Sequence, residues 1–167
     1  MAYSDWKIGE QIGEGGQAQV LKATRDGDTT VYAIKRFKNP KRQERSNTEI
    51  LNMKSLKSLS VNVPEIIDSG EYKDGRPYFV TKYYENKSLE CELENNCKNI
   101  DRIEFARQLC SEIRKMNSVS YVHRDLKPAN ILLDEHWKPV IADFGLSNNT
   151  DEQTGYTKSG EPIGSTH

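Results

Sequence analysis

The sequence predicts an α+β fold in which an antiparallel β-sheet comes first and a helical, loop-rich part follows. Within residues 7–37 and 64–83, apolar residues alternate with turn signals such as Gly13-Glu14-Gly15-Gly16 and Lys73-Asp74-Gly75. Two other stretches, residues 50–59 and 101–116, carry apolar residues at the spacing of an amphipathic helix.

These patterns predict each element in order. Residues 7–37 form three antiparallel strands joined by tight turns, and two further strands, 64–68 and 77–83, flank the turn at 73–75. The helices are expected to bury Ile50, Met53, Leu56 and Leu59 in the first, and Ile103, Ala106, Leu109, Ile113 and Met116 in the second. Residues 121–146 are expected to form loops and short strands, and no periodicity follows Ser147.

Composition excludes several classes of partner. A chain of 167 residues fits one domain or two small lobes, and a net charge of −1 gives no overall basic field for nucleic acid or anionic lipid. The basic run from Lys38 to Arg45 is interpreted as a solvated helix face. No apolar run approaches the roughly 20 residues of a membrane span, and the first residues do not predict a signal peptide. The three cysteines lack paired spacing, so we expect reduced thiols and a cytoplasmic protein.

A glycine-rich hairpin and a lysine on the next strand form the first candidate site. Gly13-Glu14-Gly15-Gly16 lets the backbone approach a triphosphate closely, although such a hairpin is often only a turn. Neither a Walker loop nor a Rossmann fingerprint fits, because a strand follows the glycines where both motifs need a helix. Lys35 lies in the apolar strand Ala33-Ile34-Lys35, either as a surface lysine at a strand end or as a phosphate contact that pairs with Glu49.

A second candidate site is formed by the segment from His123 to Asn130 together with Asp143-Phe144-Gly145. Phosphoryl transfer needs a carboxylate to orient the attacking hydroxyl, a cation near the phosphate, and oxygen ligands for magnesium. Asp125 and Lys127 supply the first two groups, and Asn130 and Asp143 supply oxygen ligands.

Together these motifs resemble those of the eukaryotic-type protein kinases, and the resemblance extends from the glycine-rich loop to the end of the chain. It implies a protein-kinase-like fold, with a five-stranded antiparallel N-lobe, one main helix and an incomplete helical C-lobe. The implied boundaries are 1–84 for the nucleotide-binding N-lobe and 85–167 for the partial C-lobe with its catalytic loop and activation segment. The implied cofactors are ATP and Mg²⁺.

The resemblance also implies roles for individual residues. Asp125 is the expected catalytic base, Lys127 the γ-phosphate contact, and Lys35, with Glu49, the contact to the α- and β-phosphates. Asn130 and Asp143 are the expected magnesium ligands. Nucleotide contacts are expected from Ile12, Gly13, Gly15, Val20, Ala33, Lys35, Leu132 and the backbones of Lys82 and Tyr84. Thr81 is the expected gatekeeper, and the expected apolar spine is Met53, Ile66, His123 and Phe144. Ala18 replaces the third glycine of the family pattern.

The type of substrate follows from Arg124 and Lys127. A lysine two residues after the catalytic Asp, as Lys127 is here, is typical of Ser/Thr kinases. Arg124 and Lys127 together distinguish this loop from those of small-molecule phosphotransferases. The expected partner is therefore a protein substrate with a Ser or Thr hydroxyl. Arg124 also resembles the arginine that receives a phosphate from the activation segment, so Thr157 or Ser159 is expected to be phosphorylated.

The chain ends at His167, where the Ala-Pro-Glu motif of the family would follow. Either it is a fragment of a longer kinase or it is a half-kinase completed by another copy or a partner. In both cases the helix at 101–116 lacks part of its packing, so we expect self-association or a partner that completes the C-lobe, and weak phosphorylation by the monomer. The expected function is an ATP-dependent Ser/Thr protein kinase. The alternative is a nucleotide-binding module that regulates a partner without phosphotransfer.

Overall fold

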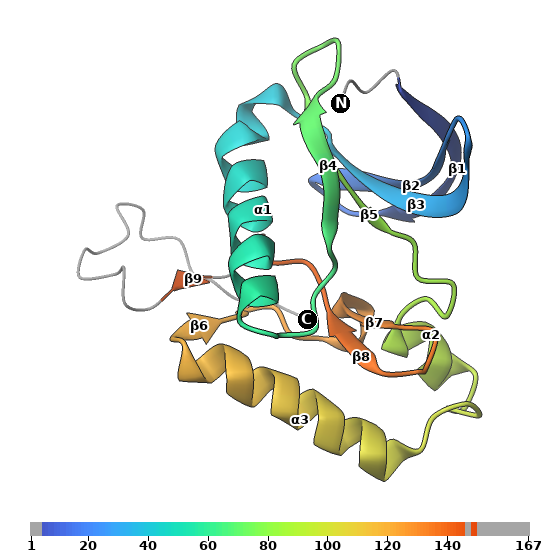
Figure 1. Cartoon of the computed structure of the whole chain (residues 1–167), viewed down its shortest axis with the longest axis vertical. Helices are drawn as coiled ribbons and strands as arrows, with labels where there is room; N and C mark the ends of the chain where they lie inside the picture. The colour runs from blue at the N-terminus through green and yellow to red at the C-terminus, as the bar shows by residue number, and fades with distance from the viewer. Residues whose placement is uncertain (1–4, 146–147, 150–167) are drawn as a thin grey trace. The chain divides into compact units, whose positions relative to one another are not determined.

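The structure is a computed structural model that describes residues 5–145 and 148–149. The chain divides into two compact units (Figure 1). The first unit is Met1–Lys54 with Pro64–Tyr83, and the second is Ser55–Val63 with Tyr84–His167. Helix α1 (Gln43–Ser58) therefore contributes most of its length to the first unit and its last turn to the second.

The first unit contains the five-stranded antiparallel sheet that is expected from the sequence, and its strand order is β1-β2-β3-β5-β4. Its strands are β1 (Trp6–Glu14), β2 (Ala18–Arg25), β3 (Asp28–Phe37), β4 (Ile66–Glu71) and β5 (Pro77–Lys82). Gly27 and Gly75 have φ angles of 77° and 78° in the β2–β3 and β4–β5 turns, a conformation that glycine adopts without steric cost. The fourth strand begins at Ile66 rather than at Pro64, since proline has no N–H for the ladder.

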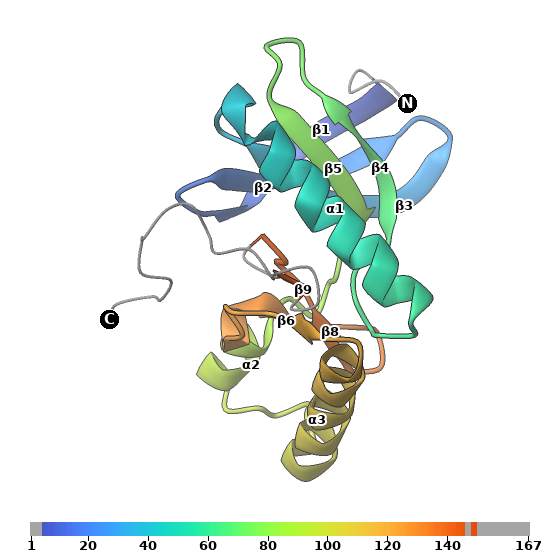
Figure 2. The same cartoon turned by 90° about the vertical axis from the view of Figure 1, so that its left-hand side faces the viewer.

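Helix α1 lies across one face of this sheet, beside β4 and β5 (Figures 1 and 2). A 3-10 turn, Pro40–Arg42, precedes it, and the Asn39 side chain caps that turn by accepting a hydrogen bond from the Lys41 N–H. Ile50, Met53 and Leu56 are buried as predicted. The prediction for Leu59 is wrong, because the helix ends at Ser58 and Leu59 is 45% exposed.

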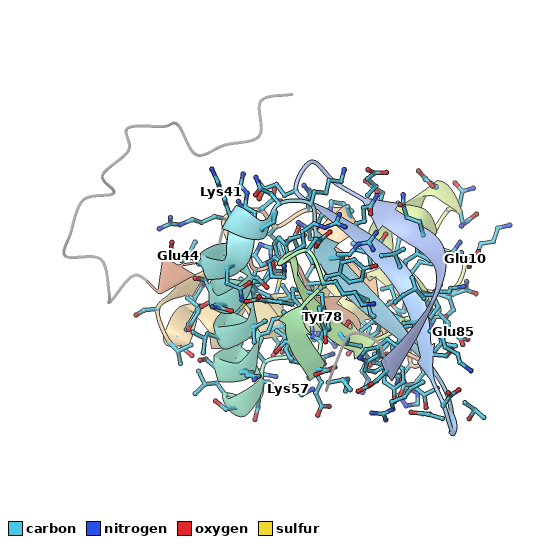
Figure 3. All side chains as sticks on the ribbon, turned by 90° about the horizontal axis from the view of Figure 1, so that it is seen from above. Glu10, Lys41, Glu44, Lys57, Tyr78 and Glu85 are labelled. Carbon is cyan, nitrogen blue, oxygen red and sulfur yellow. The ribbon has the colours of Figure 1, made fainter. Side chains whose placement is uncertain are left out.

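The interior of the first unit is partly aromatic. Trp6, Ala23, Tyr32, Ile34, Tyr78 and Val80 form one buried cluster. Trp6 and Tyr32 meet edge to face with ring centroids 5.0 Å apart, and the Trp6 indole N–H donates a 2.8 Å hydrogen bond to Asp68. Tyr78 lies in this interior, whereas Glu44 and Lys57 mark exposed positions along α1 (Figure 3).

Two helices and two small antiparallel sheets make up the second unit. The elements are α2 (Leu89–Glu94), α3 (Arg102–Ser118), β6 (Tyr121–Val122), a 3-10 turn (Pro128–Asn130), β7 (Ile131–Leu133), β8 (Pro139–Ile141) and β9 (Asn148–Asn149). Strand β7 pairs with β8, and β6 pairs with β9. The sequence does not predict α2, because its single turn and a half is too short to show helical periodicity; Ser88 caps it.

Helix α3 buries part of the predicted apolar face: Met116 is buried, and Leu109 packs on the cluster that Phe105 forms with β7. Phe105 and Met116 are buried, and Phe105 packs with Ile131 and Leu133 of β7. Ile103 is 75% exposed, and Ala106 is exposed as well, so this part of the predicted apolar face is not covered by the described residues. Ile103 and Phe105 are two residues apart, which is more than half a helical turn, so the two side chains project in opposing directions.

Candidate functional site

The glycine-rich hairpin joins β1 to β2. The Gly15 N–H donates a 2.9 Å hydrogen bond to the Ala18 carbonyl, which closes the turn. None of Gly13, Gly15 and Gly16 has a positive φ, and a Cβ added at Gly16 would meet nothing within 4 Å. Neither backbone strain nor packing in the described residues therefore demands a glycine at Gly16. The exposed backbone fits the close approach of a phosphate group.

Lys35 of β3 and Glu49 of α1 form an ion pair. The Lys35 Nζ lies 2.6 Å from Glu49 Oε1, and the side chains are 19% and 2% exposed. The ammonium also lies 5.7 Å from the ring centroids of both Phe37 and Phe79. Burial makes this pair geometrically restricted, so Glu49 holds the Lys35 ammonium in one orientation.

The residues that are expected to surround the adenine of the nucleotide are distributed over both units. Val20 and Ala33 lie half-buried on β2 and β3, Thr81 is 8% exposed on β5, and Ile12 on β1 is 38% exposed. Lys82 ends β5 and pairs with Tyr32 in the sheet register. Tyr84 and Leu132 belong to the second unit, so their place beside the nucleotide stays a prediction.

Asp125, Lys127 and Asn130 form a cluster in the second unit. One carboxylate oxygen of Asp125 lies 3.0 Å from the Lys127 Nζ and accepts a 3.1 Å hydrogen bond from the Asn130 amide nitrogen. The same amide nitrogen donates to the Asp125 backbone carbonyl at 2.9 Å. The 3-10 turn at Pro128–Asn130 returns the chain so that Asn130, five residues later, reaches Asp125. The carboxylate is thus bound by a cation and an amide.

Asp143 is connected to this cluster through the backbone of Ala142. The Ala142 N–H donates to the Asn130 carbonyl at 2.9 Å, and the Ala142 carbonyl lies 2.9 Å from His123 Nε2. Asp143 itself is exposed and has a φ of 64°, a region that non-glycine residues adopt at a cost of about 1–3 kcal/mol. Arg124, with a φ of 66°, shares this conformation. Such residues persist where the surrounding contacts hold them.

His123 is buried and neutral. Its Nδ1 accepts a hydrogen bond from the Asp125 N–H at 3.3 Å, so Nε2 carries the proton and donates to Ala142. Burial lowers the pKa of His123 below its ordinary value of 6.5. The ring packs edge to face on Phe144, with centroids 4.9 Å apart. Of the other expected spine residues, Met53 is buried and Ile66 half-buried in the first unit.

The donor set fits magnesium held together with a nucleotide. Since Asn130 Nδ2 is hydrogen-bonded to Asp125, the amide oxygen is the atom left to bind a cation. Asn130 and Asp143 thus offer two hard oxygen ligands, and a magnesium site of this kind takes its remaining ligands from phosphates and water. Within residues 5–145 and 148–149, no group of three His, Cys, Asp or Glu side chains could hold a metal by itself. A metal that arrives with phosphates agrees with both observations.

The sequence did not predict that backbone hydrogen bonds help to hold this site together. Ala142 has no functional side chain, yet both of its backbone polar groups connect the Asp143 segment to His123 and Asn130. Its position next to Asp143 was the available signal. Thr157 and Ser159, the expected phosphorylation sites, lie outside the described residues.

Residues 6–162 match the family described as the protein kinase domain. The chain belongs to the protein kinase family. A probable cell division protein kinase of Encephalitozoon cuniculi is 34% identical to this kinase chain over an alignment of 143 residues that covers 83% of the chain and 45% of the relative. A probable cyclin-dependent kinase 9 of Schizosaccharomyces pombe is 30% identical over 93% of the chain and 28% of the relative.

The serine/threonine-protein kinase Sgk1 of Xenopus tropicalis is 29% identical over 93% of the chain and 38% of its own length. These similarities identify a kinase of the eukaryotic Ser/Thr type. The chain spans less than half the length of each of these curated relatives. In the part of the kinase that the structure describes, no helix is both long and apolar enough to cross a membrane.

Proposed function

We propose that this kinase chain binds Mg-ATP and transfers the γ-phosphate to a Ser or Thr hydroxyl of a protein. The observation that carries the proposal is the Asp125 carboxylate, bound by Lys127 at 3.0 Å and by Asn130 at 3.1 Å. A carboxylate oriented in this way can accept the proton of an attacking hydroxyl, while the adjacent ammonium neutralises charge on the transferred phosphoryl group.

In the proposed reaction, the substrate hydroxyl oxygen forms a bond to the γ-phosphorus and the bond to the β-phosphate oxygen breaks, releasing ADP. The hydroxyl proton goes to Asp125. Asn130 and Asp143 would hold Mg²⁺, which supplies charge neutralisation on the phosphates when bound. The chain's own contribution is to position these groups, because phosphoryl transfer requires little covalent chemistry from the protein.

The first unit is proposed to hold the nucleotide. The Lys35–Glu49 ion pair supports a phosphate contact, since an ammonium fixed by a buried carboxylate presents its remaining N–H groups in a set direction. We propose residues 1–84 as the nucleotide-binding lobe and 85–167 as the partial catalytic lobe. Ile12, Gly13, Gly15, Val20, Ala33, Lys82, Tyr84 and Leu132 would surround the nucleotide.

The proposed partner is a protein substrate in the cytoplasm, and the charge balance supports neither nucleic acid nor membrane as a further one. Self-association is proposed through the exposed side of α3. Ile103 is 75% exposed, and Ala106 and Cys110 follow it on the same side and are exposed too. Packing of two copies would cover an apolar strip of this kind. If a different protein covers it instead, the chain alone stays monomeric.

A phosphotransfer assay tests the activity. The chain with Mg-ATP and a generic basic protein should transfer phosphate, weakly as a monomer, and Asp125→Asn should reduce the rate by a factor of about 100 or more, since a positioned proton acceptor contributes about 100–10,000-fold. If the chain binds nucleotide and transfers no phosphate even where it self-associates, the result favours the alternative of a nucleotide-binding regulatory module.

A thermal-shift titration tests the metal assignment. A ligand that binds only the folded chain raises the melting temperature, so Mg-ATP should stabilise the wild type more than ATP with EDTA does. Asp143→Asn should remove most of that difference. Equal magnesium dependence in the wild type and the variant would show that Asp143 is no ligand.

A further inference from the structure

Strand β8 leads directly into Ala142 and Asp143, and one of its edges is paired with β7. Asn62, which belongs to no strand, binds the opposite edge. The Ile141 N–H donates to the Asn62 carbonyl at 2.9 Å, and the Asn62 side-chain amide donates to the Pro139 carbonyl at 2.9 Å. Asn62 thereby satisfies the Ile141 N–H and the Pro139 carbonyl, two polar groups that an adjacent strand would otherwise bind.

Asn62 is itself fixed by helix α3. Its backbone N–H donates a 2.7 Å hydrogen bond to Glu112 Oε2. The other carboxylate oxygen of Glu112 accepts a 2.7 Å bond from the Lys115 ammonium, which also donates to the Ser60 carbonyl at 3.1 Å. The Glu112 side chain is 13% exposed, so its bond with the Asn62 N–H forms away from most of the solvent and is stronger than a bond at the surface.

The connection continues to the expected magnesium ligands. Two residues after Pro139 the Ile141 N–H is bound by Asn62, and the next residue, Ala142, is bound to Asn130. Asp143 follows with its φ of 64°, a conformation that its neighbours have to maintain. Every residue of this chain of contacts, from Glu112 to Asp143, belongs to the second unit.

We propose that Glu112, acting through Asn62, is a positioning residue that holds the Asp143 carboxylate in place for magnesium. The inference rests on the proposed function, because it assumes that Asp143 and Asn130 bind the metal. Glu112 touches neither of them, and its effect runs through hydrogen bonds to the strand that carries Asp143. Residues that orient metal ligands from one step away change metal affinity by about 10–100-fold when removed.

The chain provides a matched control in the same helix. Glu104 forms an i,i+3 ion pair with Arg107 at 2.8 Å, as Glu112 does with Lys115 at 2.7 Å. The Glu104 side chain accepts hydrogen bonds from Arg107 and Gln108, and its N–H donates to Asp101, so these contacts remain within the first turns of α3 and its cap. Glu104→Ala therefore removes a helix carboxylate and an ion pair without releasing Asn62.

The experiment measures magnesium dependence and local opening in the full chain. ATP affinity is titrated against Mg²⁺ for the wild type, Glu112→Ala, Glu112→Gln and Glu104→Ala, and amide hydrogen exchange is followed at Ile141 and Ala142. We expect Glu112→Ala to raise the half-saturating Mg²⁺ concentration about tenfold or more and to speed exchange at both amides. ATP affinity in EDTA should stay unchanged. Glu112→Gln keeps an oxygen for the Asn62 N–H and should retain most of the wild-type response.

Three results would overturn the proposal: an unchanged half-saturating Mg²⁺ concentration in Glu112→Ala, unchanged exchange at Ile141 and Ala142, or an equal effect of Glu104→Ala. Faster exchange with normal magnesium dependence would reduce Glu112 to a structural residue. If the wild type itself shows no magnesium-dependent binding, the proposed function fails and the metal-positioning role falls with it. Exchange at Ile141 then decides separately whether Glu112 holds the segment.

Discussion

Among the charged side chains of the described residues, Glu49 is the most deeply buried, at 1% exposure. A carboxylate in this environment depends on its partner, because an ionised group without a counter-charge is costly away from water. Lys35 provides the counter-charge at 2.6 Å. The exposed pair of Lys38 and Glu14, at 2.5 Å, has the same chemistry in solvent, where such a pair contributes little to stability. Burial, and not the ion pair alone, makes Lys35 and Glu49 structurally coupled.

Replacing one residue of the Lys35–Glu49 pair should therefore destabilise the fold more than replacing both. Lys35→Met leaves Glu49 buried without its ammonium and should lower the free energy of unfolding by about 3 kcal/mol. The double variant Lys35→Met with Glu49→Leu should recover most of that loss. Urea denaturation measures both, with Lys38→Met as the exposed control that should leave the midpoint nearly unchanged. A double variant less stable than Lys35→Met would contradict this account.

His123 should make stability depend on pH. Because burial lowers its pKa in the folded chain, the folded state favours the neutral ring and the unfolded state binds the proton more readily. The stability that the neutral His123 ring contributes is fully present above the ordinary pKa of 6.5. It is lost as the pH falls toward the lower pKa that His123 has in the folded chain. The melting temperature should accordingly decline between pH 7.5 and 5.5, about one unit either side of that ordinary pKa.

Replacing the titrating ring tests this assignment. His123→Gln keeps a neutral donor and acceptor, so its melting temperature should change less over the same pH interval. The exposed His136→Gln is the matched control and should follow the wild type. Parallel curves for wild type and His123→Gln would show that another group is responsible.

At the scale of elements, the helices of the second unit depend on polar side chains at their starts. The Asp101 carboxylate accepts hydrogen bonds from the N–H groups of Ile103 and Glu104 at 3.0 and 3.1 Å. Those N–H groups have no partner within the helix, and a negative charge also complements the helix dipole. Because α3 carries both Phe105, which packs on β7, and Glu112, its start influences the packing of the whole unit.

The N-cap gives a prediction for α3. Asp101→Ala should lower the free energy of unfolding by about 1 kcal/mol, whereas Asp101→Asn, which keeps a capping oxygen, should lose much less. Denaturant midpoints of the two variants measure the difference. Equal losses would show that the capping hydrogen bonds contribute nothing beyond the charge.

At the scale of the whole molecule, the two units are held internally by contacts between distant parts of the chain. Trp6 bonds Asp68, which is 62 residues away, in the first unit, and Asn62 bonds Pro139, which is 77 residues away, in the second. The Ser55–Val63 segment belongs to the second unit although the sequence on both sides of it belongs to the first. Helix α1 is thus continuous with both units, and the exposed Ile103 side of α3 is a surface of the second.

That surface predicts concentration-dependent association. Ile103→Asp places a charge on the exposed apolar side and should shift the chain toward monomer in light scattering at concentrations where the wild type associates. Leu51→Asp is the matched control, because Leu51 is 63% exposed on α1 and should leave association unchanged. A wild type that is monomeric throughout would contradict self-association through α3.

The sequence alone determined the class of fold and the chemistry of the candidate site. Alternation and turn residues predicted the five strands, because a half-buried strand requires a period of two wherever it lies. The site residues from His123 to Asn130, and Asp143 to Gly145, could be predicted because each group is contiguous in sequence. The ion pair of Lys35 with Glu49 was predicted from a lysine in an apolar strand and a carboxylate on the next helix.

Only the tertiary structure decided which side of a helix is buried and what supports the site. The apolar spacing in α3 is compatible with burial of more than one side of the helix. Packing on β7 buries Phe105 and leaves Ile103 exposed. The support of Asp143 depends on Asn62 and Glu112, 50 residues apart in sequence, which meet through a backbone N–H that any residue except proline carries. Periodicity and motifs report local order, whereas contacts of this kind arise only when distant segments pack together.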